Sequence, residues 1–191
     1  IFSVEGAKAD FGAMIKRSRD VANGMSRGVQ FLMKKNKIEV LTGTGKLLKG
    51  NKVQVTDASG KKTEYAAKSI ILATGSRSKE LPNLKQDGKK IIGYREAMNL
   101  PSQPKSMIVV GAGAIGVEFA YFYNSIGTKV TIVEFLPVLV PVEDEEVSKE
   151  LEKIYKKKGI NIMTGSSVEK IDTSGTNCKV TVKSSKIGRA H

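Results

Sequence analysis

The chain has 191 residues, of which 40% are hydrophobic, and this size and composition suit one large folded domain or two small ones rather than a disordered chain. No apolar run approaches the roughly 20 residues that a membrane span needs, and the first residues do not form a secretory signal, so we expect no membrane partner and a cytoplasmic location. The net charge of +13 comes from scattered lysines without interleaved aromatic residues or a recognition motif, which favours a solvated surface over a nucleic-acid partner.

Two residue types that often carry chemistry are scarce. The chain holds one cysteine, Cys178, and one histidine, His191. A single cysteine excludes an internal disulfide framework, which is consistent with a reducing cytoplasm. One cysteine and one histidine also cannot form a zinc cluster, so we expect no metal site. We interpret Cys178 as a small apolar residue that is buried or half-buried.

The first half of the chain combines a long helix with short strands. Apolar residues from Met14 to Leu32 recur at spacings of three and four and predict a helix over residues 10–36. Alternating or continuous apolar runs then predict four strands, the last of them buried because it is almost wholly apolar. These strands are expected at residues 38–41, 53–56, 63–66 and 69–73. Glycine and proline interrupt residues 77–104, which we interpret as a connection with a short helix at 95–100.

A second unit begins at Ser106 and alternates strands with helices. Strands are expected at residues 107–110, 129–134, 160–163, 167–171 and 179–182, and helices at 115–126 and 143–158. Gly127 and Gly159 follow the two helices at the position that favours a left-handed residue. The order strand, helix, strand, helix and strand indicates a doubly wound α/β domain.

A glycine-rich turn joins the first strand and the first helix of this second unit. The run from Gly111 to Gly116 has the spacing G-x-G-x-x-G. In a dinucleotide site the first glycine permits the tight turn, the second lets the pyrophosphate reach the backbone, and the third lets the helix pack close to the strand. Glu134 ends the next strand, where it would accept hydrogen bonds from the ribose and repel the 2′-phosphate of NADP. The pattern predicts an NAD site, the alternative being a turn that only packs a helix beside a solvated Glu134.

Several stretches resemble one family of flavoproteins. The run from Ile70 to Ser76 is similar to the strand ending in Ala-Thr-Gly that precedes the second glycine fingerprint in proteins with two dinucleotide-binding domains. Residues 130–136 and 144–151, together with residues 37–52, narrow the resemblance to the dihydrolipoyl dehydrogenase family of pyridine nucleotide-disulfide oxidoreductases. The resemblance extends from Asp10 to Val182 and is most specific from Gly111 to Leu151.

The resemblance implies an α/β fold with a Rossmann-like NAD domain, part of an FAD domain, and the cofactors NAD and FAD. It implies NAD contacts at Gly111, Ala112, Gly113, Ala114, Ile115, Gly116, Val117, Glu118, Glu134 and Val168. It implies FAD contacts at Gly45, Thr74, Gly75 and Ser76, although residues 74–76 also suit an ordinary turn after a strand. Glu118 resembles a glutamate that reaches towards the flavin, the alternative being a solvated helix residue, and we expect no other catalytic residue in this chain.

The family implies a homodimeric enzyme that oxidises dihydrolipoamide on the lipoyl domain of an acyltransferase and reduces NAD⁺. The sequence lacks the family's own FAD fingerprint, its Cys-x-x-x-x-Cys pair and its acid–base histidine, so we expect an internal fragment that is inactive alone. The alternatives are an NADH oxidase, mercuric reductase or transhydrogenase of the same family, or a non-enzymatic NAD-binding module.

These expectations divide the chain into four parts. A partial FAD-binding domain occupies residues 1–76, a connection follows at 77–104, and an NAD-binding domain covers 105–186. Residues 187–191, Ile-Gly-Arg-Ala-His, have no periodicity and match one reading frame of a common sequencing adapter, ATC GGA AGA GCA CAC. We therefore predict a non-native tail.

Overall fold

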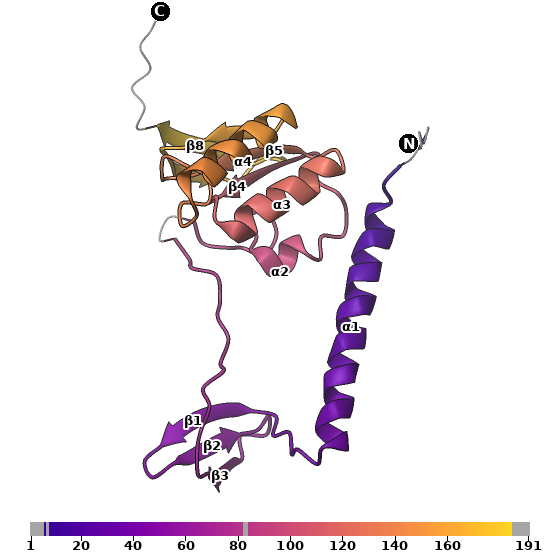
Figure 1. The fold of residues 1–191 in the computed structure, drawn as a ribbon, viewed down its shortest axis with the longest axis vertical. Coiled ribbons are helices and arrows are strands. Elements are labelled where there is room, and N and C mark those ends of the chain that lie inside the picture. The colour runs from indigo at the N-terminus through magenta and orange to yellow at the C-terminus, as the bar shows by residue number, and fades with distance from the viewer. Residues whose placement is uncertain (1–5, 7, 82–83, 185–191) are drawn as a thin grey trace, which may run out of the picture. The chain divides into compact units, whose positions relative to one another are not determined.

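The computed structural model describes residue 6, residues 8–81 and residues 84–184. Residues Lys16–Arg77 form one compact unit, and the other described residues form a second one. Figure 1 shows the helices and strands of both units. The expected tail at 187–191 lies outside the described residues.

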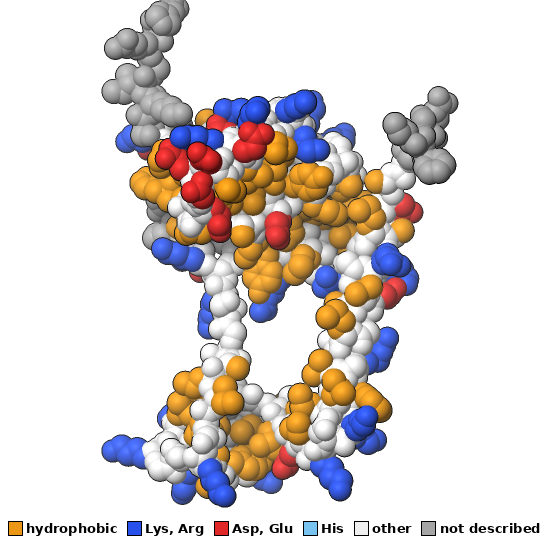
Figure 2. All heavy atoms as spheres, viewed as in Figure 1, with side chains coloured by type: hydrophobic (Ala, Val, Ile, Leu, Met, Phe, Trp, Pro, Cys, Tyr) orange, Lys and Arg blue, Asp and Glu red, His pale blue; other side chains and the backbone are white. Residues whose placement is uncertain are grey.

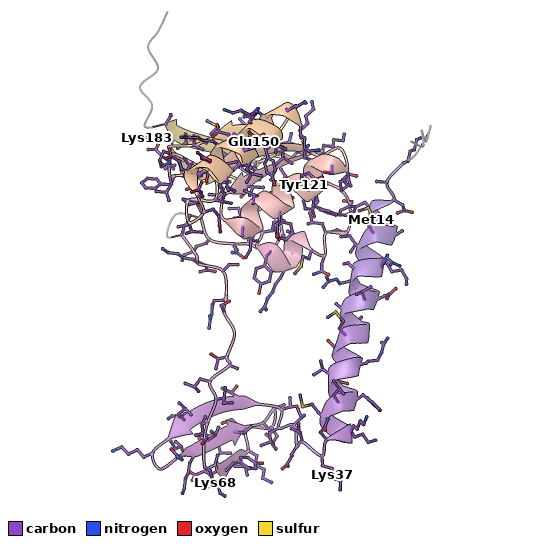
Figure 3. All side chains as sticks on the ribbon, in the orientation of Figure 1. Met14, Lys37, Lys68, Tyr121, Glu150 and Lys183 are labelled. Carbon is purple, nitrogen blue, oxygen red and sulfur yellow. The ribbon has the colours of Figure 1, made fainter. Side chains whose placement is uncertain are left out.

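The first unit contains most of a long helix and a small antiparallel sheet. Helix α1 spans Phe11–Lys35, within one residue of the predicted bounds. It ends where Lys37, labelled in Figure 3, adopts a left-handed φ of 55° and the N–H of Ile38 donates to the carbonyl of Met33 over 2.9 Å. The sheet has the order β1-β2-β3, formed by Thr44–Leu48, Lys52–Thr56 and Lys62–Ala66. The predicted strands at 53–56 and 63–66 are thus confirmed, whereas β1 was not predicted as a strand.

Two predicted strands of the first half are wrong. Residues 38–41 and 69–73 form neither helix nor strand. Ile71 is 90% exposed, and Leu72 is also exposed, although the apolar run predicted burial. A strand needs a neighbour that accepts and donates its backbone hydrogen bonds, and no described strand pairs with these residues. The apolar composition of these two runs therefore indicated that they tend to be buried, but it did not specify the segment that would pair with them.

The second unit is built around a parallel sheet with the order β4-β5-β6. Its strands are Ser106–Val110, Lys129–Val133 and Asn161–Met163, and they alternate with helices α3, Ala114–Ser125, and α4, Glu145–Lys157. The sequence predicted these five elements within two residues at each end. Gly127 and Gly159 have φ values of 98° and 84°, as the predicted helix ends require. An antiparallel pair follows, formed by β7, Ser166–Asp172, and β8, Lys179–Ser184.

The core of this unit lies between α3, α4 and the parallel sheet. Because the strand order follows the chain order, right-handed crossovers place both helices on the same face of the sheet, as Figure 1 shows. The hydroxyl of buried Tyr155 on α4 donates to the carbonyl of Val117 on α3 over 2.9 Å. Tyr123 on α3 is fully buried, and its ring lies 6.1 Å from that of Phe11, at the start of α1. These contacts hold α3 against α4 and against the first residues of α1.

The segment before β4 packs against the same unit. It contains the short helix α2, Tyr94–Ala97, where the sequence predicted a helix at 95–100. The hydroxyl of Tyr123 donates to the carbonyl of Ala97 over 2.5 Å, and the hydroxyl of Thr128 donates to the carbonyl of Pro104 over 2.8 Å. The ammonium of Lys90 donates to the carbonyls of Thr173 and Gly175 in the β7–β8 turn, both over 2.5 Å.

The surface is rich in lysine and carries exposed apolar side chains on both units, as Figure 2 shows. On α1 the predicted apolar stripe is solvent-exposed at Val21, Met25 and Val29. Within residues 6, 8–81 and 84–184, no helix combines the length and apolar character that a membrane crossing requires.

Candidate functional site

The glycine-rich turn leaves β4 and enters α3 with the geometry that its three glycines predict. Gly111 has a φ of 102°, which L side chains rarely adopt, and its N–H donates to the carbonyl of Val133 over 2.9 Å. A Cβ atom at Gly116 would overlap the carbonyl oxygen of Gly111 and lie 3.1 Å from its carbonyl carbon. A Cβ atom at Gly113 would meet nothing within 4 Å. The first glycine therefore allows the turn, the third allows close packing, and the second faces open space.

The first turn of α3 offers backbone donors to that open space. Gly113 is the residue that precedes the helix, and no side chain caps it. Among the described residues, the Gly113 N–H has no acceptor. Ala114 and Ile115 follow it on the exposed side, with Ile115 61% exposed. Uncapped N–H groups and the positive end of the helix dipole together suit an anionic ligand.

Glu134 lies against this turn, although 22 residues separate it from Ala112. Its Oε2 atom accepts a hydrogen bond from the N–H of Ala112 over 2.6 Å, and its Oε1 atom accepts one from the N–H of Leu136 over 2.7 Å. The side chain is only 7% exposed. Because a carboxylate has about four lone-pair positions, two such bonds leave capacity for further donors such as ribose hydroxyls. A solvated Glu134, the alternative left open by the sequence, is excluded.

The other candidate NAD contacts occupy different positions around the turn. Ala112 and Val117 are buried, whereas Glu118 is exposed on α3. Burial raises the pKa of the Tyr155 hydroxyl, and the charges of Tyr121 and Glu118 raise it further. Glu118 therefore lies near enough to Tyr155 to act on its pKa. Val168 is half-buried on β7, opposite Val182 and beside a β-bulge. The start of β7 is held near the acidic residue, because the N–H of Ser166 donates to the carbonyl of Glu134 over 2.8 Å.

The candidate FAD contacts all lie in the unit formed by Lys16–Arg77. Gly45 is on β1, opposite Val55 of β2. Thr74, Gly75 and Ser76 are exposed residues without regular structure, and Gly75 has a φ of 70°. Their backbone is accessible to a ligand.

The structure describes Cys178, one of the two residues for which the sequence indicated no active role. Cys178 is half-buried immediately before β8, and its thiol is free. His191 lies outside the described residues. No group of three or more histidine, cysteine, aspartate or glutamate side chains in the described part of the chain could hold a metal ion.

Sequence reasoning missed two backbone hydrogen bonds, one to Glu134 and one to the glycine turn. The N–H of Leu136 binds Glu134, and the N–H of Val140 donates to the carbonyl of Ala112 over 2.8 Å. Neither residue type signals such a role, because any residue but proline carries the donor. Val140 also has a φ of 40°, a conformation that valine rarely adopts and that no sequence pattern predicts.

The parallel strand order, the glycine turn and the buried acid beside it define a Rossmann-type α/β fold. Comparison with known families narrows this class, because the family model described as "Pyridine nucleotide-disulphide oxidoreductase" matches residues 3–189. The chain belongs to this family.

Individual relatives agree with this assignment. The chain is 45% identical over 185 residues to the dihydrolipoyl dehydrogenase of Chlorobaculum tepidum, covering 96% of this chain and 39% of the relative. It is 41% identical over 173 residues to that of Zymomonas mobilis, covering 90% and 37%. The chain therefore spans about two fifths of the length of these relatives.

Two solved structures share the fold. The structure is similar to that of LpdA from Mycobacterium tuberculosis, with a TM-score of 0.84 and 25% identity over 92% of this chain and 40% of that one. It is also similar to the HOCl-induced flavoprotein disulfide reductase RclA from Escherichia coli, with a TM-score of 0.79 and 25% identity over 91% and 39%.

Proposed function

We propose that residues 105–186 form the NAD-binding domain of a flavin-dependent dihydrolipoyl dehydrogenase. The observation that carries this proposal is the arrangement of the glycine turn: a backbone open at Gly113, uncapped N–H groups at the start of α3, and the carboxylate of Glu134 bonded to Ala112. This arrangement fits the pyrophosphate and the adenosine ribose of a dinucleotide. Residues 1–76 then contribute part of an FAD-binding domain, and residues 77–104 connect the two.

The proposed NAD site uses the chain's own residues in separate roles. The N–H groups of Gly113 and Ala114 would hold the pyrophosphate, and free lone pairs of Glu134 would accept the ribose hydroxyl protons. Ile115, exposed beside them, would cover one side of the cofactor, and the backbone of Val168 would lie near the adenine. Glu118 would reach towards the flavin.

Glu134 also gives a reason for NAD rather than NADP. A 2′-phosphate placed beside this buried carboxylate would bring two negative charges together in a site of low exposure. The next residues are Phe135 and Leu136, so no arginine follows that could neutralise the phosphate.

The proposed activity of the whole protein is supported by the relatives. Several of them, 41–45% identical to this chain, are dihydrolipoyl dehydrogenases. In that reaction the two thiols of dihydrolipoamide form a disulfide, and NAD⁺ takes up a hydride while a proton is released. FAD and NAD supply the electron transfer when bound. We propose a lipoyl domain of an acyltransferase as the substrate carrier, a homodimer as the assembly and the cytoplasm as the location.

The test is a titration of the purified chain with NADH and NADPH, followed by the fluorescence of the reduced nicotinamide. NADH should bind at least about tenfold more tightly, the scale of one repelled charge contact. Equal affinities, or no binding of either, would contradict the proposed site. Glu134→Arg should narrow or reverse the preference, but it also removes the acceptor of two backbone N–H groups. Glu134→Gln is the matched control, because it removes the charge and keeps one acceptor oxygen.

A further inference from the structure

The peptide units around Ala112 are held from two directions. Its N–H donates to Oε2 of Glu134 over 2.6 Å, and its carbonyl accepts from the N–H of Val140 over 2.8 Å. Glu134 and Val140 both belong to the connection between β5 and α4, so this one connection holds Ala112 of the glycine turn at two points. The turn is therefore fixed by its surroundings as well as by its glycines.

Val140 makes its contact in a strained conformation. Its φ of 40° lies in the left-handed region, where a β-branched side chain is crowded, and Pro141 after it restricts the backbone further. The residue is only 7% exposed. Its carbonyl accepts from the N–H of Glu143 over 2.9 Å and from the hydroxyl of Ser148 on α4 over 3.5 Å. Strain of this kind persists only where the surroundings hold the residue in place, and it is concentrated at functional sites.

The consequence for the site follows from peptide geometry. The described chain has no cis peptide bond, so the carbonyl of Ala112 and the N–H of Gly113 point in opposite directions across one planar unit. Because Val140 fixes the carbonyl, it also fixes the direction of the Gly113 N–H. That N–H has no acceptor among the described residues, and the space beside Gly113 is open.

We propose that Val140 is a positioning residue for dinucleotide binding: its main-chain N–H holds the Ala112 carbonyl and thereby aims the Gly113 N–H at the pyrophosphate. The inference rests on the proposed NAD-binding function and adds to it a residue outside the glycine motif. The side chain of Val140 packs the loop, and the backbone donor acts on the ligand through Ala112.

The experiment removes this donor while keeping the side chain. The amide of Val140 is replaced by an ester in the 191-residue chain, and binding of NADH is compared with binding of adenosine, which lacks the pyrophosphate. NADH should bind about tenfold more weakly, whereas the affinity for adenosine should change less than about twofold. The matched control is Val140→Gly, which keeps the N–H and tolerates the left-handed φ. It should keep NADH affinity within about threefold while losing thermal stability.

The outcomes separate this inference from the proposed function. If the unaltered chain binds no NADH, both fail. If the unaltered chain binds NADH and the ester binds it equally well, only the role of Val140 fails. Equal losses for NADH and adenosine, or a tenfold loss in Val140→Gly, would show a merely structural role and overturn it. If the ester chain does not fold, an NMR titration of the unaltered chain with NADH tests the inference instead. NADH should shift the amide resonance of Gly113. An unmoved resonance would refute the inference that the Gly113 N–H is directed at the pyrophosphate.

Discussion

Adding one methyl group at two positions of the glycine turn should give opposite results. In Gly116→Ala, the new Cβ would overlap the carbonyl oxygen of Gly111 and stand 3.4 Å from Cγ1 of Val109. The atom that it strikes belongs to the backbone of the turn and cannot rotate away. Overpacking of this kind costs about 1–3 kcal/mol, and we expect the upper half of that range before the gain of about 1 kcal/mol in helix propensity. The free energy of unfolding should fall by about 1–2 kcal/mol.

In Gly113→Ala, the same methyl group enters open space, and the φ of −68° suits alanine. Alanine stabilises a helix less than glycine does at the position before its first turn, but it also lowers the conformational entropy of the unfolded chain. These two effects on stability are each about 0.5–1 kcal/mol and largely cancel. Stability should therefore change by less than about 1 kcal/mol. The methyl group would nevertheless stand where the pyrophosphate approaches the backbone, so NADH should bind at least about tenfold more weakly.

The assay for both variants is urea unfolding followed by circular dichroism, together with NADH titration by fluorescence. Gly116→Ala should lose stability, and Gly113→Ala should lose affinity at nearly unchanged stability. If Gly116→Ala is as stable as the unaltered chain, the close packing of α3 on β4 is not what that glycine provides. If Gly113→Ala binds NADH normally, the dinucleotide does not use this turn.

Three further outcomes follow from the structure and the sequence. Burial raises the pKa of Tyr155, so the folded chain should lose stability as the pH rises above the ordinary tyrosine value of about 10, and alkaline unfolding curves should flatten in Tyr155→Phe. The backbone N–H groups of Lys89, Ile91 and Lys90 lower the pKa of Asp87. The stability that Asp87 contributes is therefore present above the ordinary carboxyl pKa and is lost as the pH falls through the pKa of the folded state. Asp87→Asn should show a smaller loss of stability between pH 5 and about 2. Because the FAD glycine fingerprint and a second cysteine beside Cys178 are absent from the sequence, the purified chain should be colourless and should not reduce NAD⁺ with dihydrolipoamide, and a yellow preparation or turnover lost in Cys178→Ser would contradict this.

The sequence predicted the second unit well because several independent signals agree there. Apolar strand patterns and helix-stopping glycines at 127 and 159 indicate the same elements, and the acidic first turn and basic last turn of α4 suit its dipole. Asp144, for example, precedes α4 and accepts a hydrogen bond from the N–H of Glu146 over 2.8 Å. The glycine motif also predicted the three distinct environments of its glycines, because each follows from the absence of one side chain.

The prediction failed where structure depends on a distant partner. The run at 69–73 has strand composition but no described strand beside it, so it stays irregular and is exposed except at the half-buried Ile70. The loop after β5 shows the same limit within the site. Its contacts come from backbone N–H groups of Leu136 and Val140, which side-chain patterns do not reveal. Side-chain chemistry could locate the acid and the turn, whereas the way that they are held together required the fold.

The bonds that join the segment before β4 to the parallel-sheet unit have a consequence for how the chain opens. The hydroxyl of Tyr123 donates to the carbonyl of Ala97, and the side chains of Thr128 and Gln103 join the last residues before β4 to the connection between α3 and β5. If this segment detached, the buried hydroxyl of Tyr123 would lose its acceptor inside an apolar core, at a cost of about 1–3 kcal/mol. The amide protons of the segment before β4 should therefore exchange with solvent together with those of α3, as one cooperative unit. They should not exchange through the low-energy local openings that are typical of a loop.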